Sequence, residues 1–266
     1  MIIDFHTHAF PDALAPRAIP ALAKSAGLAP LHDGTAAGLV DRMDKSGVDR
    51  SVVLSIATKP AQENAVNTFA INLLHHPRLI PFGSVYPGSE TWREQLDRLA
   101  GAGIKGIKLH PEYQNFDLDC EAALEIYERC GALGLIVLFH AGEDAAFQPP
   151  VHTGAARINR VCALFPQTTF VAAHLGGYHM WDDAAQNLVP RENLYLDCSM
   201  TRTAEKIENA AAREIVRKMG AAHILLGSDS PWENPSDSIE GVRSLGLSEE
   251  ETAAILSGNA QRLLAL

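Results

Sequence analysis

Short apolar segments alternate along the chain with longer segments in which apolar residues recur every three or four positions. The short segments are rich in Ile, Val, Leu and Phe, as in strands that are buried on both faces. Eight such segments occur: Ile2–His6, Ser51–Ile56, Ile80–Tyr86, Ile104–His110, Leu135–His140, Thr168–His174, Leu194–Cys198 and His223–Gly227. Strands that alternate with helices predict parallel pairing through right-handed crossovers.

The helical pattern fills the intervals between these strands. Helices are expected at Ala36–Ser46, Gln62–Leu74, Glu90–Ala102, Cys120–Ala132, Ala155–Phe165, Trp181–Leu188 (the weakest pattern) and Ala204–Met219, and two more at Asp237–Leu245 and Glu249–Leu256. An open doubly wound sheet would satisfy the same order. Eight units, with no Gly-rich phosphate-binding motif after any strand, favour a closed (β/α)₈ TIM barrel. No repeat or linker divides the chain, so residues 1–266 are expected to form one α/β domain.

Composition narrows the classes of partner. The formal net charge of −10 argues against a nucleic-acid partner, because phosphate contacts require clustered Lys and Arg. The four cysteines form no C-x-x-C pair, and the first residues lack the basic flank and apolar run of a signal peptide. No segment reaches the roughly 18–20 apolar residues of a membrane helix. We therefore expect a cytoplasmic protein that acts on a small molecule, without a membrane partner; barrels often dimerise, so a homodimer is one assembly to consider.

Polar residues gather at the ends of the predicted strands. In a TIM barrel, the carboxyl ends of the strands carry the active site. The residues there are, in chain order, His6, His8, Lys108, His110, His140, His174, Asp197 to Ser199, and Asp229. Five of the eleven histidines thus end predicted strands. This placement predicts an active site at the carboxyl-terminal face.

The segment His6-Thr7-His8 is the strongest local signal for a metal site. Residues two apart in a strand share a face, with Cα atoms roughly 6.5–7 Å apart, and two such imidazoles can bind one ion. Two ordinary histidines at a strand end are the alternative. His140 and His174 each end an apolar run, where a polar group needs a partner. Asp229 could bind a metal, accept a proton from water, or cap the following turn.

Together these residues resemble a known family. The H-x-H of strand one, single histidines ending strands five and six, an aspartate after strand eight, and the strings AHLGG and LLGSDSPW resemble the amidohydrolase superfamily, in its amidohydrolase-related ("amidohydrolase 2") branch. The resemblance runs from Asp4 to the closing SGNAQRLL. It implies a metal site of His6, His8, His140 and Asp229, with His174 as a second-site ligand or an acid/base residue.

The resemblance also implies a cofactor of one divalent metal. Zn²⁺ is the first expectation and Mn²⁺ or Fe²⁺ are alternatives, because mixed His/Asp sites accept several ions; a second metal stays open. The end of strand four departs from the binuclear pattern of a bridging carboxylated lysine or glutamate. It carries Lys108 and His110, which share a face by alternation. Lys108 could anchor substrate, become a carboxylated bridge, pair with Asp4, or extend outward through a bulge.

We expect a metal-dependent hydrolase that activates water to cleave an amide, lactone or ester bond in a small, carboxylated substrate. Asp229 would accept the proton of the water, and His174 would stabilise the oxyanion or move protons. Substrate contacts are expected from Lys108, His110, Tyr113, Tyr178 and Trp232, with Arg202 as another candidate for a carboxylate. The alternative is a metal-dependent, non-oxidative decarboxylase of an aromatic or unsaturated acid. Two other functions would predict different features. A metal-binding protein that had lost catalysis would be expected to lack one of the metal ligands, and a nuclease would be expected to have a basic rim around the site.

Overall fold

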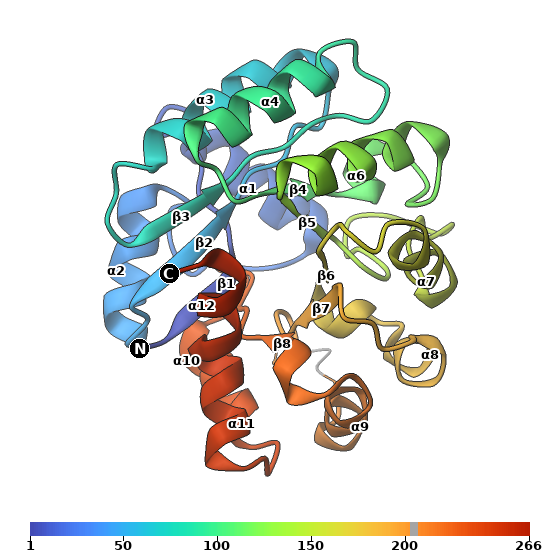
Figure 1. The fold of residues 1–266 in the computed structure, drawn as a ribbon. Helices are drawn as coiled ribbons and strands as arrows, with labels where there is room; N and C mark the ends of the chain where they lie inside the picture. The colour runs from blue at the N-terminus through green and yellow to red at the C-terminus, as the bar shows by residue number, and fades with distance from the viewer. Residues whose placement is uncertain (203–206) are drawn as a thin grey trace.

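The computed structural model describes residues 1–202 and 207–266. Its strands follow one another in parallel order, as the alternating pattern predicts (Figure 1). They are β1 (Ile3–Thr7), β2 (Arg50–Leu54), β3 (Leu79–Phe82), β4 (Gly106–Leu109), β5 (Ile136–Phe139), β6 (Phe170–Ala172), β7 (Leu194–Asp197) and β8 (Ile224–Leu225). β1 to β3 form one hydrogen-bonded group and β4 to β8 form another.

Backbone hydrogen bonds across both seams join the two groups of strands. Between β3 and β4, Gly83 N donates to Gly106 O (3.0 Å) and Lys108 N donates to Gly83 O (2.8 Å). Between β1 and the segment after β8, Phe5 N donates to Leu226 O and Asp229 N to His6 O, each at 2.7 Å. The chain therefore forms the TIM barrel that the sequence predicts.

The main helices cover the outside of the barrel. They are α2 (Ala36–Ser46), α3 (Glu63–Leu73), α4 (Trp92–Ala102), α6 (Glu121–Leu133), α7 (Ala155–Leu164), α8 (Trp181–Asn187), α9 (Asn209–Met219), α10 (Pro235–Arg243), α11 (Glu249–Ala253) and α12 (Asn259–Leu264). A short α5 (Pro111–Gln114) follows β4. No helix among the described residues is long and apolar enough to span a membrane.

The largest differences from the sequence-based expectations lie in three helices. A helix that was not expected, α1 (Ala15–Ala26), follows β1, although it contains Pro20. Its apolar residues were not recognised as a helical period because two prolines and several alanines dilute the pattern. The expected helix Ala204–Met219 begins at Asn209, and its expected start falls at 203–206, outside the described residues. The last predicted helix is longer, because a π-helical segment (Ala254–Gly258) connects α11 to α12.

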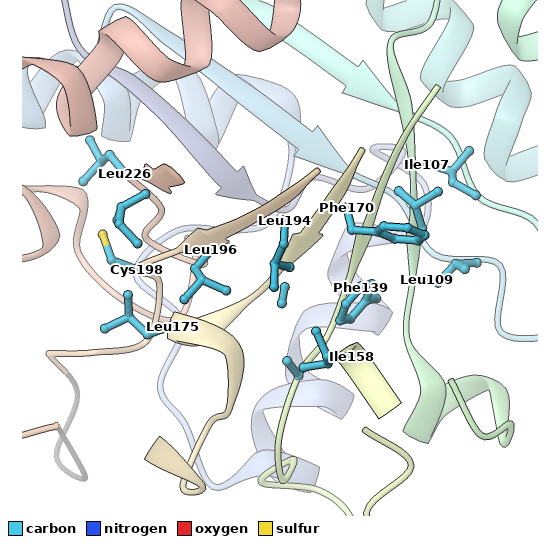
Figure 2. Packing of buried hydrophobic residues seen from close by; sticks show 14 of the residues in the cluster. Ile107, Leu109, Phe139, Ile158, Phe170, Leu175, Leu194, Leu196, Cys198 and Leu226 are labelled. Atoms are coloured by element: carbon cyan, nitrogen blue, oxygen red, sulfur yellow. The ribbon is translucent and has the colours of Figure 1, made fainter. Parts of the chain in front are cut away.

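Buried apolar residues form two clusters, which follow from the alternation of side chains along each strand. One cluster includes Ile107, Leu109, Phe139 and Phe170 together with residues of the helices (Figure 2). The other contains residues of seven strands and Ala260 and Leu264 of α12: Ile3, Phe5, Val52, Leu54, Phe82, Ile136, Leu138, Val171, Ala173, Tyr195 and Leu225. This second cluster fills the interior of the barrel.

Candidate active site

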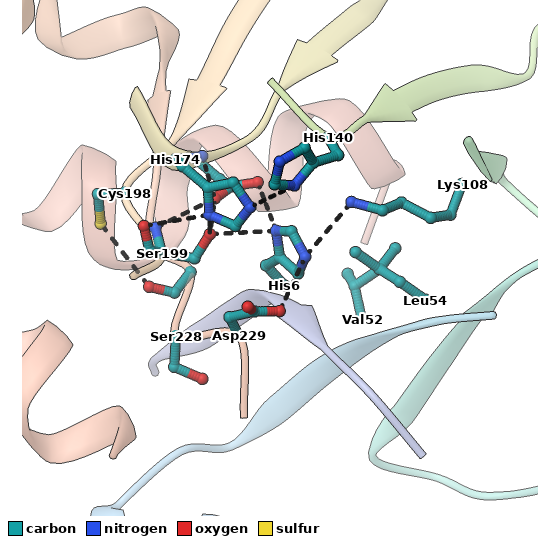
Figure 3. Close-up of polar contacts among 12 residues, drawn as sticks. His6, Val52, Leu54, Lys108, His140, His174, Cys198, Ser199, Ser228 and Asp229 are labelled. Atoms are coloured by element: carbon teal, nitrogen blue, oxygen red, sulfur yellow. Dashed lines mark hydrogen bonds and ion pairs between the residues drawn. The ribbon is translucent and has the colours of Figure 1, made fainter. Parts of the chain in front are cut away.

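Lys108, in β4, points toward the polar side chains at the ends of the strands, as the alternation of side chains predicts. Ile107 and Leu109 belong to the cluster between strands and helices, whereas Lys108 Nζ lies 3.5 Å from His6 Nε2 (Figure 3). The Lys108 side chain is 1% exposed. The structure thus contradicts an outward-pointing Lys108, and it places the lysine beside the predicted metal ligands.

His6, His8 and Asp229 converge on one point. Asp229 Oδ1 lies 2.8 Å from His8 Nε2 and 3.2 Å from His6 Nε2. The other nitrogen of each ring has its own acceptor: His6 Nδ1 lies 2.9 Å from Asp197 Oδ2, and His8 Nδ1 lies 2.9 Å from Leu54 O. A proton on each Nδ1 satisfies these acceptors and leaves the two Nε2 lone pairs directed at a carboxylate oxygen.

Three electron-pair donors that face one another require a cation between them. A carboxylate or carbonyl acceptor behind each imidazole is the arrangement that orients histidines as metal ligands. In the absence of a metal, a proton on His6 can take this role. Burial opposes this proton, but the carboxylates of Asp197 and Asp229 together outweigh burial and raise the pKa of His6. The donor set of two imidazoles and one carboxylate therefore fits a divalent transition-metal ion.

Asp197, at the end of β7, supports the predicted metal ligand His6, and the sequence did not reveal this pairing. It is fully buried and accepts hydrogen bonds from His6 Nδ1, the backbone N of His174 (3.3 Å) and the backbone N of Ser199 (3.1 Å). Burial would raise its pKa, but His6 and these donors hold the pKa of Asp197 well below its ordinary value. The position of Asp197 at the end of a strand was visible in the sequence, but its partner was not.

Ser199 connects the two histidine groups. Its Oγ hydrogen-bonds Asp197, and it lies 3.1 Å from His6 Nδ1 and 2.8 Å from His174 Nδ1. His174 Nε2 in turn lies 3.0 Å from His140 Nδ1. One hydrogen-bonded network therefore links the ends of β1, β5, β6 and β7.

His140 does not share the convergence point of the other predicted ligands. Its Nε2 lies 2.8 Å from Glu143 O, and its donor atoms group with those of His110 and Asp144. Its Nδ1, the nitrogen left to accept, faces His174. The structure brings together three of the four predicted ligands, and a ligand role for His140 stays a prediction.

Three predictions for Lys108 remain, and the structure decides the one that concerns Asp4. Asp4 does not pair with it, since the Asp4 carboxylate accepts from Ser228 Oγ (2.5 Å), Ser228 N (3.0 Å) and His6 N (3.2 Å). Burial raises the pKa of Asp4 to about 7. Burial also lowers the pKa of Lys108 to about 8, so its charge is readily adjusted near neutral pH. Roles of Lys108 as a substrate anchor or as a carboxylated bridge stay predictions.

His110 binds an aspartate rather than pointing freely into the mouth. Its Nδ1 accepts from Tyr113 N (3.5 Å), which leaves Nε2 to donate to Asp144 Oδ2 at 3.3 Å. Burial lowers the pKa of His110 to about 4, so the neutral ring is the stable form. Burial alone would raise the pKa of Asp144, but the hydrogen bond from His110 and the neighbouring His140 together outweigh burial and hold this pKa below its ordinary value. His110 therefore orients Asp144 at the cavity.

Both predicted catalytic residues have an unusual backbone. His174 has φ 57° and Asp229 has φ 64°, in the left-handed region that non-glycine residues rarely adopt. Such conformations persist only where the surrounding structure enforces them, and they concentrate at functional sites. Burial, followed by the charge of His140, keeps the pKa of His174 well below its usual value. His174 is therefore a neutral hydrogen-bonding group.

These residues line one cavity at the carboxyl ends of the strands. Its polar walls are His6, His8, Lys108, His110, His140, Asp144, His174 and Asp229. The predicted substrate contacts Tyr113, Tyr178 and Trp232 also line it. Arg202 does not: its guanidinium donates to Asn209 Oδ1 (2.9 Å) and Ser244 Oγ (2.6 Å), outside this cavity.

The sequence matches the amidohydrolase family model over residues 3–266. The chain belongs to the amidohydrolase family. No curated protein sequence matches it. Among solved structures, it is similar to an uncharacterised TIM-barrel protein from Bordetella bronchiseptica, with 21% identity, a TM-score of 0.81, and coverage of 99% of this chain and 98% of that one.

Two enzymes are among the other similar structures. A dihydroxybenzoic acid decarboxylase from a Polaromonas species, with bound manganese and the inhibitor 2-nitroresorcinol, has 18% identity and a TM-score of 0.73, over 100% of this chain and 97% of that one. A probable 2-pyrone-4,6-dicarboxylic acid hydrolase from Acinetobacter baumannii, with citric acid bound, has 17% identity and a TM-score of 0.70, over 100% and 99%. At these identities the likeness establishes the fold, and the family match indicates an enzyme of amidohydrolase type.

Proposed function

We propose that the protein is a metal-dependent hydrolase that cleaves an amide, lactone or ester bond in a small substrate. The convergence of His6 Nε2, His8 Nε2 and Asp229 Oδ1 supports this proposal, because these three donors need a cation. They would hold the ion, with His140 as a fourth ligand. Zn²⁺ is our first candidate for the ion and Mn²⁺ is the second. When bound, the ion would polarise the scissile carbonyl and lower the pKa of a nearby water.

The protein's own residues supply the proton transfers. Asp229 is ionised, since the neighbouring His6 and His8 overcome the effect of burial and hold its pKa well below the ordinary value. A carboxylate at this position can accept a proton from the attacking water and return it to the leaving group. His174 Nε2 lies 3.0 Å from His140 Nδ1, so His174 would move a proton along this contact during the reaction. Lys108 would hold a substrate carboxylate.

The second candidate is non-oxidative decarboxylation of an aromatic or unsaturated acid. It would use the same donors, and the manganese and resorcinol inhibitor in the similar Polaromonas decarboxylase favour it. The four cysteines are free, which supports a reducing, cytoplasmic setting for either reaction.

The test supplies purified protein with Zn²⁺ or Mn²⁺ and screens lactones, amides, esters and carboxylated aromatics. A cleaved or ring-opened product supports hydrolysis, whereas released CO₂ identifies the lyase. Asp229→Asn should leave the fold intact and reduce kcat by at least about 10³-fold, since a positioned general base and a metal ligand are lost together. Near-normal turnover by this variant with its metal bound would contradict the assignment.

A further inference from the structure

The active-site cavity has one wall without polar groups. The lining residues between His8 and β2 are Phe10, Leu22, Ala26 and Leu28, which we call the α1 wall. α1 is drawn behind the strands in Figure 1, on the side away from α12. The polar ligands and Lys108 come instead from the strand ends. The cavity is therefore divided between a polar floor and an apolar wall.

Helix α1, which provides Leu22 and Ala26 of the α1 wall, has an apolar stripe that is fully buried only in its first half. Ala15, Ile19, Leu22 and Ala26 recur at helical spacing and so share a face. Ala15 and Ile19 are buried, whereas Leu22 and Ala26 are half-buried. The protein thus covers the first half of the stripe and leaves the second half facing the cavity.

The α1 wall does not pack with the hydrophobic core. Among the described residues, neither apolar cluster includes Phe10, Leu22, Ala26 or Leu28, even as partly buried neighbours. Apolar side chains that stay half-exposed in a concave site gain free energy when a ligand removes them from water. This wall therefore has the properties of a ligand-binding surface.

Charge restricts the ligand further. Within the described part of the chain, Lys108 is the single Lys or Arg that lines the cavity, and it lies at the polar floor beside His6. The α1 wall offers no cation and no hydrogen-bond donor from its side chains. A second carboxylate placed against it would lose its hydration without a partner, which costs several kcal/mol.

From these observations we propose that the substrate is monoanionic or neutral, with one carbonyl or carboxyl head group at the floor and an uncharged hydrocarbon body against the α1 wall. This inference rests on the proposed function for the position of the head group. It goes further by excluding dicarboxylates, and it makes Leu22 and Ala26 determinants of specificity. The α1 wall would select the body of the substrate while the strand-end residues act on the head.

Binding of three probes tests this without requiring turnover. Isothermal titration of Zn²⁺-supplied protein compares propanoate, 3-phenylpropanoate and 3-(4-carboxyphenyl)propanoate, which share a head group and differ in the body. 3-Phenylpropanoate should bind at least about tenfold more tightly than propanoate, as expected for burial of an aromatic ring. The dicarboxylate should lose this advantage. Equal affinity of all three, or tighter binding of the dicarboxylate, would overturn the inference and leave the proposed function standing.

Variants of α1 assign the effect to the wall. Leu22→Ala should weaken binding of 3-phenylpropanoate about threefold to tenfold and leave propanoate unchanged. Leu14→Ala is the matched control, because Leu14 precedes the same helix, is 42% exposed and does not line the cavity. Leu22→Lys should increase affinity for the dicarboxylate about tenfold by adding the missing cation. An unchanged preference in both Leu22 variants contradicts the role of the wall, and failure of every probe to bind contradicts the head-group site as well.

Discussion

Asp197→Asn tests the physical basis of the candidate metal centre. One Asp197 oxygen accepts from two backbone N–H groups, those of His174 and Ser199, and from the Ser199 hydroxyl; the other accepts from His6 Nδ1 at 2.9 Å. In the variant, the amide oxygen will keep the three donors, so the NH₂ group must face His6. Two donors then oppose each other, and His6 avoids this by moving its proton from Nδ1 to Nε2.

The new tautomer places a proton where the ion would bind. Loss of such a supporting carboxylate typically weakens metal binding about 10- to 100-fold, or roughly 1.4–2.8 kcal/mol. Titration of Zn²⁺ against a competing chelator measures the change, and circular dichroism confirms the fold. Asp97→Asn, which alters a surface carboxylate paired with Arg129, is the control and should bind as the wild type does. Wild-type affinity in a folded Asp197→Asn protein would refute this account of the site.

Two further predictions concern stability. Burial raises the pKa of Glu233 to about 7, so the folded protein prefers the protonated side chain. The stabilisation of the fold from this preference is present below the unfolded pKa and is lost as the pH rises toward 7. Glu233→Gln should therefore stabilise the protein at pH 8, by at most about 3 kcal/mol, and change its stability little at pH 4. Melting temperatures at the two pH values measure this, and a difference that does not depend on pH would count against it. Gly142→Ala should cost roughly 2–4 kcal/mol, because φ is 91° and the added Cβ would lie 2.2 Å from Tyr178 N. Gly101→Ala meets open space within α4 and should stabilise by roughly 0.5–1 kcal/mol; equal melting shifts in the two glycine variants would refute the steric argument.

The barrel and the identity of the rim residues were determined by the sequence itself. Parallel strands buried on both faces have a nearly continuous apolar composition, and the alternation of side chains requires Lys108 and His110 to share a face. The same local rule put His6 and His8 together. Each of these conclusions depends on residues close in sequence, whose relative positions the backbone geometry fixes.

Pairings between distant strands were decided only by the tertiary structure. Asp197 supports His6 across 191 positions, and His110 holds Asp144, which the sequence presents only as a loop residue. Arg202, a reasonable anchor for a carboxylate by position, is directed elsewhere by Asn209 and Ser244. Closure of the barrel sets these contacts, because it brings the ends of all strands into one ring. Helix α1 shows the same limit. Its prolines and alanines hid the apolar stripe in the sequence, and only the position of the helix in the barrel shows that half of this stripe faces the active site.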